Sequence, residues 1–598
     1  MTPLPYPQTI WPRLHVRSAE RRWVLVYALA VVFLTTLPYL AAAGRQGESW
    51  AFTGFVFGVE DGNSYIAKML SGAAGAWLFR TPYTYLPQAG VLAYLPYLLL
   101  GKLTVPPAQH EQLVALFHMF RIAGIFACCL ATYDFLAYFL GEVRWRRLGL
   151  LLATLGGGLG WLFAALGVTG WLAALPRGAI LGLDLPLAYY SPEAFGFLEL
   201  YGLPHLAFGR AFFLWALLAI LGAISWTASQ AGEARLARPS AANRYGLPDG
   251  LIAGLCLLGL GLMQPATVLV AWIVIGAFLA AVWAARRSFS IFRKTPLLWR
   301  AVWAGVIPAP LVIYTAWAFA RDPVLRGWSA QNAIISPNPV YYLLAYGGLI
   351  PLVFIGVRRL WLSLGLPALL PLAWLVVLPV LAYAPVNLQR RLIEGVWVAW
   401  LVLALAALDR PVPAAAAGES GRVRRWLRPY LLILSALMLV PAFILLVGGM
   451  AAARSPAVPI FRPAEQAQAF TELAGQAAPG EVVLASYATG NALPAWTPLR
   501  VVIGHGPETV GLVDLLPQVA EVFASETSEA VRRAHLAEWH VRYVYWGPDE
   551  RALGAWDPYT APYLQLLLAV GEGLYPLAQN MAEADRAISL NPSDKFVA

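Results

Sequence analysis

Two neighbouring carboxylates, Glu60 and Asp61, stand in the segment 59–69, shortly after the first long apolar run ends. A carboxylate at the membrane surface can act as a general base and remove the proton of an attacking hydroxyl group. If a helix begins near Asn63, a structural role is the alternative, because a helix N-terminus stabilises negative charge. Adjacent helical residues point about 100° apart, so only one acid would face a site. We favour Asp61, because Gly62 follows it and allows close approach of a backbone or ligand.

Lys68 follows Asp61 by two helical turns and would share its helix face. Its ammonium group could pair with one of the acids or with a phosphate. A purely structural ion pair is the alternative for this side chain, and the sequence leaves both interpretations open.

Five further polar side chains are expected on the same outer face. Two acids and a histidine belong to the second outer loop and its end, and two arginines belong to a later turn: Glu193, Glu199, His205, Arg390 and Arg391. Arginine stays charged and binds phosphate through two parallel hydrogen bonds, so the arginine pair predicts a phosphate site. The alternatives are snorkelling arginines, solvated loop acids and a histidine that caps a helix.

Composition places these residues in a membrane protein. Of the 598 residues, 59% are hydrophobic and 12% are charged, whereas soluble domains carry about 25% charged residues. The net charge of +10 comes largely from arginines in short loops between apolar runs, where membrane topology explains them. The sequence has no basic and aromatic pattern typical of nucleic-acid binding, so we expect no nucleic-acid partner.

About eleven membrane spans are predicted, since each crossing needs about 20 apolar residues. The N-terminus, 1–22, is basic and is predicted to be cytoplasmic. The membrane domain covers 23–453, with outer loops at 44–112, 173–204, 321–339 and 385–395. The predicted spans are 23–43, 113–140, 148–172, 205–228, 249–263, 266–285, 301–320, 340–357, 362–384, 395–408 and 430–450.

Three features refine this topology. The run 86–103 is short and contains prolines, so we interpret it as an interfacial or re-entrant helix. The glycine run 156–160 predicts close helix packing within a span. Arg390 and Arg391 fall outside, against the positive-inside pattern.

The three cysteines lie in apolar segments and are interpreted as small core residues.

The composition changes after residue 453. Short apolar runs at 481–486, 500–504 and 541–546 predict strands, and the stretches 464–475, 511–524 and 528–538 predict helices. This alternation indicates an extracytoplasmic α/β accessory domain over 454–590, followed by a disordered tail, 591–598. Its polar side chains that could contact a ligand are Tyr487, Asn491, His505, Glu508 and Tyr545.

The acidic pair in a first outer loop, followed by further helices, resembles the GT-C membrane glycosyltransferases. The similarity is to bacterial mannosyl- and arabinosyltransferase-type proteins and their RgtA/B/C/D-like relatives. It lies in 60–87, with Trp77-Leu78-Phe79 and Thr81-Pro82-Tyr83-Thr84 after the acids, and the multi-span layout extends it to about Met450.

The resemblance implies a polyprenyl-phosphate-linked sugar donor, a glycan, lipid or protein acceptor, and transfer on the outer face of the cell membrane with inversion at the sugar carbon. Asp61 or Glu60 would be catalytic, and the other outer-face residues would bind substrate. The family has members with and without a metal, so a role for Mg²⁺ or Mn²⁺ remains open. The sequence contains no cluster of His and Cys residues that would indicate a zinc site.

Two other function classes remain. A transporter or flippase for a lipid-linked or small polar substrate is the main alternative, although transporters usually show internal repeats and charges near mid-membrane. A membrane anchor for the C-terminal domain would need far fewer spans. We therefore predict a polytopic α-helical membrane glycosyltransferase with a C-terminal soluble α/β domain.

Overall fold

The computed structural model describes residues 16–106, 109–167, 170, 174–177, 185–230, 247–289, 291–292, 295–409, 421–570 and 575–580. The chain forms two compact units. Unit 1 contains Met1–Thr36, Phe120–Thr315 and Ile334–Gly448, and unit 2 contains Leu37–Met119, Ala316–Ala333 and Gly449–Ala598. Residues 1–15, most of the basic loop 229–248 and the predicted tail 591–598 lie outside the described residues.

Seven helices or helical runs in the described part of the chain are long and apolar enough to cross a membrane. They cover Ser18–Ala43, Gln109–Phe139, Pro204–Gly222, Pro265–Arg286, Leu297–Arg321, Pro339–Leu364 and Arg425–Arg454. Two shorter apolar helices cover Asp249–Met263 and Leu366–Ala382. The chain is therefore a multi-pass helical membrane protein, and the count of about eleven spans stays a prediction.

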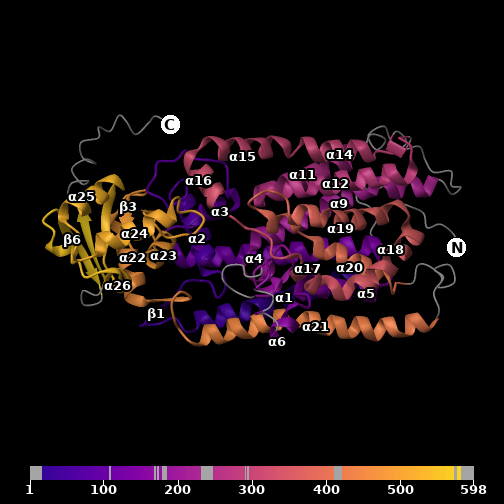
Figure 1. The fold of residues 1–598 in the computed structure, drawn as a ribbon, viewed down its shortest axis with the longest axis horizontal. Coiled ribbons are helices and arrows are strands. Elements are labelled where there is room, and N and C mark those ends of the chain that lie inside the picture. The colour runs from indigo at the N-terminus through magenta and orange to yellow at the C-terminus, as the bar shows by residue number, and fades with distance from the viewer. Residues whose placement is uncertain are drawn as a thin grey trace. The chain divides into compact units, whose positions relative to one another are not determined.

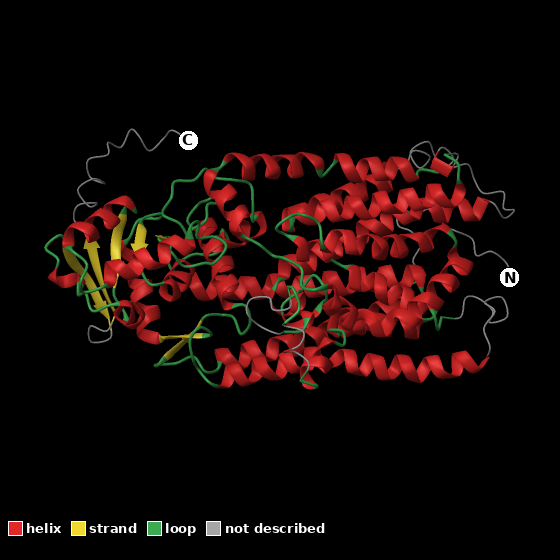
Figure 2. Ribbon diagram, in the orientation of Figure 1, coloured by secondary structure: helices red, strands yellow, loops and turns green. Residues whose placement is uncertain are grey.

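Unit 1 consists of helices, as Figures 1 and 2 show. Their buried side chains form one apolar core. Its main helices are α5 (Val143–Leu155), α9 (Pro204–Gln230), α11 (Leu247–Met263), α12 (Pro265–Arg286), α14 (Leu297–Val306), α17 (Pro339–Tyr346), α18 (Ile350–Leu364), α19 (Leu369–Ala382) and α20 (Val396–Ala406). Helix α20 is apolar on every side and buried from Val396 to Ala406, apart from the half-buried Trp400, as expected for a helix enclosed by others.

The predicted break between two spans at Gln264 is confirmed. Helix α11 ends at Met263, and α12 begins at Pro265. Gln264 has an extended φ of −156°, because the ring of a following proline disfavours the helical conformation at the preceding residue.

Three predicted spans differ from the observed helices. Helix α5 ends at Leu155, where the prediction extended one span over 148–172, because Gly156 is extended and Gly158 has a positive φ of 68°. The span predicted over 301–320 divides into α14 and α15 (Ala309–Arg321), with Pro308 between them. Arg358 and Arg359, expected in a loop, lie within α18.

Unit 2 contains all the described strands and the acidic segment. Its sheet has the order β4-β3-β5-β7-β6, with β3 (Val482–Leu484) parallel to β4 (Arg500–Val501) and β5 (Val541–Tyr545). The strands β6 (Leu564–Val570) and β7 (Tyr575–Asn580) complete it as an antiparallel pair. The helices α22 (Ala464–Gln476), α24 (Leu512–Phe523) and α25 (Glu529–Glu538) agree with the predicted stretches, whereas β6 and β7 were missed.

The C-terminal segment pairs with the segment 44–112 through backbone hydrogen bonds. Strand β1 (Trp50–Phe52) pairs antiparallel with β2 (Phe461–Pro463). The backbone N–H of Val501 donates to the carbonyl oxygen of Pro82 at 2.8 Å. The described part of the run 86–103 contains a single short helix, α3 (Leu95–Gly101). Backbone pairing therefore fixes the α/β segment against the chain that carries the acids.

Candidate functional site

Both acids lie in the first turn of α2 (Val59–Ala73). Gly58 precedes the helix in the left-handed region, with a φ of 58°, which glycine adopts without steric cost. The helix begins before the acids, whereas the sequence suggested a start near Asn63. The carboxylates of Glu60 and Asp61 are exposed and stand where the helix dipole stabilises negative charge.

Glu60 is tied to the C-terminal segment by two hydrogen bonds. Its Oε1 accepts from the hydroxyl of Tyr487 at 2.6 Å and from the backbone N–H of Gly506 at 2.8 Å. Burial and this hydrogen bond to Glu60 raise the pKa of Tyr487, so its hydroxyl stays a donor. One oxygen of the Glu60 carboxylate is thus held by neutral donors.

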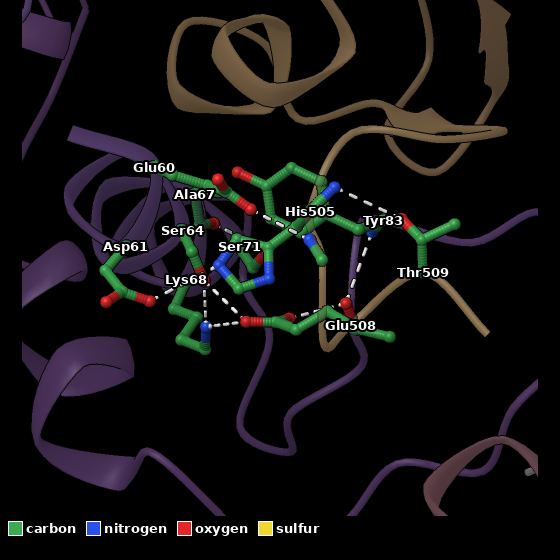
Figure 3. Close-up of polar contacts among 12 residues, drawn as sticks. Glu60, Asp61, Ser64, Ala67, Lys68, Ser71, Tyr83, His505, Glu508 and Thr509 are labelled. Atoms are coloured by element: carbon green, nitrogen blue, oxygen red, sulfur yellow. Dashed lines mark hydrogen bonds and ion pairs between the residues drawn. The ribbon is translucent and has the colours of Figure 1, made fainter. Parts of the chain in front are cut away.

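Asp61 has a different neighbour. Its Oδ1 lies 3.5 Å from Nε2 of His505, and the Asp61 side chain is 60% exposed while that of His505 is 5% exposed (Figure 3). Burial lowers the pKa of His505, but Asp61 and Glu508 outweigh burial, so the pKa is raised above its ordinary value. Asp61 is therefore the acid of the pair that combines exposure with a basic partner.

Lys68 is buried and paired with Glu508. Its Nζ lies 2.6 Å from Oε1 of Glu508, with 1% and 3% of the two side chains exposed, and it also donates to Ser64. The carboxylate of Glu508 also accepts from Ser64 at 2.6 Å (Figure 3). It accepts from Thr81 at 2.6 Å as well. Burial raises the pKa of Glu508, but Lys68 and His505 together hold it below its ordinary value.

Aromatic rings surround the ammonium group of Lys68. Its Nζ lies 4.4 Å from the centroid of Tyr94 and 5.4 Å from that of Phe79. The ring faces add electrostatic attraction to the ion pair. Of the two roles that the sequence left open, this environment favours the structural ion pair. Lys68 connects α2 to the C-terminal loop that carries Glu508.

Gly62 does not have the role that the sequence suggested. A Cβ atom there would lie 2.4 Å from the ring of Phe55, so the glycine admits a ring of the protein itself. The preference for Asp61 consequently rests on its exposure and on His505.

The loop 504–511 brings its side chains to α2 because two contacts fix its path. The hydroxyl of Thr509 accepts the backbone N–H groups of Gly504 and His505 at 3.2 Å each. Gln331, the last residue of α16 (Pro323–Gln331), donates to the carbonyl oxygens of Pro507 and Thr509 at 2.9 and 2.7 Å. The loop is thus held from α16 while it contacts both acids.

The remaining predicted site residues belong to unit 1. Glu199 and Glu394 both pair with Arg210 of α9, at 2.5 and 2.8 Å, and all three side chains are buried. Oε1 of Glu193 lies 3.9 Å from Nε of Arg391. Sequence analysis missed Arg210, although a lone arginine in an apolar span is itself a functional signal.

Arg390 and His205 complete this group. The guanidinium of Arg390 lies 4.9 Å from the centroid of Tyr190. Nε of Arg390 and of Arg391 is buried without a hydrogen-bond partner in the described part of the chain. His205 is half-buried in the first turn of α9. A buried arginine nitrogen retains the capacity to bind an anionic group.

We assign no metal ligands in the described part of the chain. Among the described residues, no group of three or more His, Cys, Asp or Glu side chains is arranged to hold a metal ion. The divalent cation left open by the sequence therefore stays a prediction without named ligands.

No family model matches the chain, and no curated protein matches it. Several solved structures are similar. The archaeal oligosaccharyltransferase AglB from Archaeoglobus fulgidus, in complex with an inhibitory peptide and a dolichol-phosphate, is 14% identical; the match covers 88% of this chain and 70% of that one, with a TM-score of 0.48.

Two other solved structures are similar over most of this chain. ArnT from Cupriavidus metallidurans, bound to undecaprenyl phosphate, is 14% identical, with 94% and 98% of the two chains covered and a TM-score of 0.48. The arabinofuranosyltransferase AftD from Mycobacteria is 14% identical, with 94% and 41% covered and a TM-score of 0.45. By the length and composition of its described helices, the chain is a multi-span membrane protein.

Proposed function

We propose that this protein is an integral-membrane glycosyltransferase that moves a sugar from a polyprenyl-phosphate-linked donor to an acceptor on the outer face of the membrane. Asp61 is the general base. The observation that carries this assignment is the contrast within the acidic pair: Asp61 is 60% exposed beside His505, whereas Glu60 is bonded to Tyr487 and Gly506.

The bonds and protons of the reaction balance between the donor, the acceptor and the base. An acceptor oxygen attacks the anomeric carbon, its proton passes to Asp61, and a new glycosidic bond forms. The bond from that carbon to the donor phosphate breaks, and the polyprenyl phosphate leaves with the electron pair. Direct displacement inverts the configuration at the sugar carbon.

The cations proposed for the donor phosphate are Arg390 and Arg391. Neither Nε atom has a hydrogen-bond partner among the described residues, and Nε of Arg391 lies 3.9 Å from Oε1 of Glu193. A phosphate oxygen would supply a charge-assisted hydrogen bond. The lipid chain would lie among the apolar helices.

The test uses purified protein in detergent or vesicles with a mixture of polyprenyl-phosphate sugars and acceptor extract. Asp61→Asn keeps the size of the side chain and removes the base, so transfer should fall by about 10²- to 10⁴-fold, the contribution of a positioned general base. Donor binding should change little. Full activity of Asp61→Asn would overturn this mechanism.

A transporter or flippase for a lipid-linked substrate is the second candidate. Its supporting observation is the buried cluster of Arg210 with Glu199 and Glu394, because ionisable groups within membrane helices often mark an ion or substrate path. Movement of a labelled lipid-linked sugar across vesicles without transfer would favour it.

A further inference from the structure

His505 is almost completely buried, yet its ring faces an exposed carboxylate. Nε2 lies 3.5 Å from Oδ1 of Asp61. Among the described residues, neither ring nitrogen of His505 makes a hydrogen bond of ordinary length and angle. Burying polar groups without partners costs free energy, so the placement of this ring needs an explanation beyond packing.

Contacts other than the one with Asp61 hold the loop and the ring of His505. The N–H of His505 donates to Thr509, and Gln331 holds the next residues of the loop. The ring of Tyr83 packs against the imidazole at 5.2 Å between centroids. The imidazole is therefore held in place, and its Nε2 favours the Asp61 rotamer whose Oδ1 lies beside it.

We propose that His505 is a positioning residue for Asp61, and that it holds the exposed carboxylate in the orientation in which it accepts the proton of the acceptor. This inference rests on the proposed function. It makes the loop 504–511 of the C-terminal segment part of the active site, where the sequence suggested an accessory domain.

A proton relay through His505 is not needed. The side chain of Asp61 is 60% exposed, so water can remove the proton after each transfer. A general base must instead be oriented toward the acceptor, because displacement of a reacting group by about 1 Å can cost about 100-fold in rate.

The charged groups around His505 favour an ion pair with Asp61. Asp61 and Lys68 face it from α2, Glu508 from its own loop, and Tyr83 from the preceding outer loop. The two acids raise the pKa of the imidazole in spite of burial and of Lys68. Its positive form, which attracts the carboxylate, is therefore present over a wider pH range.

A double-mutant cycle on the full-length protein tests the inference, with turnover and acceptor KM measured separately. His505→Gln should lower turnover by up to about 100-fold and leave the acceptor KM nearly unchanged. In the Asp61→Asn background the same change should have little further effect, because His505 acts through Asp61.

His110→Gln is the matched control. His110 is also buried in unit 2, stacks on Trp496 at 3.8 Å and bonds to the carbonyl oxygen of Ala495, so its loss reports a structural effect alone. Thermal unfolding of all variants shows whether each is folded under assay conditions.

The outcomes separate the two hypotheses. Equal losses from His505→Gln in the wild-type and Asp61→Asn backgrounds, or a loss in His110→Gln as large as in His505→Gln, would overturn the positioning role. Inactive Asp61→Asn with fully active His505→Gln would also overturn it while the proposed function stands. A fully active Asp61→Asn variant would overturn both the positioning role of His505 and the proposed mechanism.

Discussion

Lys68 and Glu508 are 440 positions apart in the chain, yet their charged atoms lie 2.6 Å apart in a buried ion pair. The pair joins the helix that carries the acids to the loop that carries His505. Because each charge is desolvated, each depends on the other for its stability in the folded state.

Removal of either partner of this pair should destabilise the protein. Lys68→Met or Glu508→Gln should each cost about 3–5 kcal/mol, since an uncompensated buried charge or an unmatched polar network remains. Thermal unfolding in detergent measures the change. Lys68→Met combined with Glu508→Leu should recover part of the loss, and Glu526→Gln, at an exposed acid, should have no effect.

Glu508 and His505 make the stability of the folded protein depend on pH. The folded pKa of Glu508 lies below 4.5, so its contribution is present above 4.5 and is lost as pH falls through the folded pKa. The folded pKa of His505 lies above 6.5, so its contribution is complete below 6.5 and is lost as pH rises through the folded pKa.

A pH series of unfolding temperatures can isolate the His505 contribution. The difference between wild type and His505→Gln should be largest below pH 6.5 and should shrink at alkaline pH. A difference that grows with pH would contradict the assignment of His505 as a cation in the folded protein.

Glu60→Gln should keep most of the transferase activity. The amide oxygen can still accept from Tyr487 and Gly506, and in the proposed mechanism the proton goes to Asp61. Turnover measured beside that of Asp61→Asn checks the distinction. A deeper loss in Glu60→Gln than in Asp61→Asn would exchange the roles of the two acids.

Arg390→Ala should weaken donor binding before it slows turnover. The variant removes the guanidinium that packs on Tyr190 and leaves the donor phosphate without one charge-assisted partner. The KM for the lipid-linked donor should rise while the acceptor KM stays nearly constant. Arg425→Ala, at an exposed position near the start of α21 (Gly421–Arg454), is the matched control.

Topology can be checked by cysteine labelling in a parent with Cys256 replaced by serine. Asp61→Cys and Val513→Cys, both at exposed positions, should react with an impermeant reagent from the outside. Arg425→Cys should react only after the membrane is opened. Labelling of Arg425→Cys alone in intact cells would reverse the predicted orientation.

Apolar run length and proline placement made much of the fold predictable. The break at Gln264, the helices α22, α24 and α25 and the strands β3 to β5 follow from local periodicity and from backbone restrictions that neighbours in the chain impose. The close packing predicted for the glycine run is present, since a Cβ atom at Gly157 would lie 2.6 Å from Pro441. The end of α5 at Leu155 was missed, because glycine permits both close packing and helix termination.

The sequence by itself determined a multi-span helical protein, an α/β segment near its C-terminus and an acidic pair at a helix start. Only the tertiary structure decided that His505 and Glu508 meet α2, that Lys68 is buried in an ion pair, and that Arg210 pairs with Glu199 and Glu394. Periodicity and capping act within a few residues. The partner of a buried charge is chosen by packing between separate segments, which for Lys68 and Glu508 lie 440 positions apart.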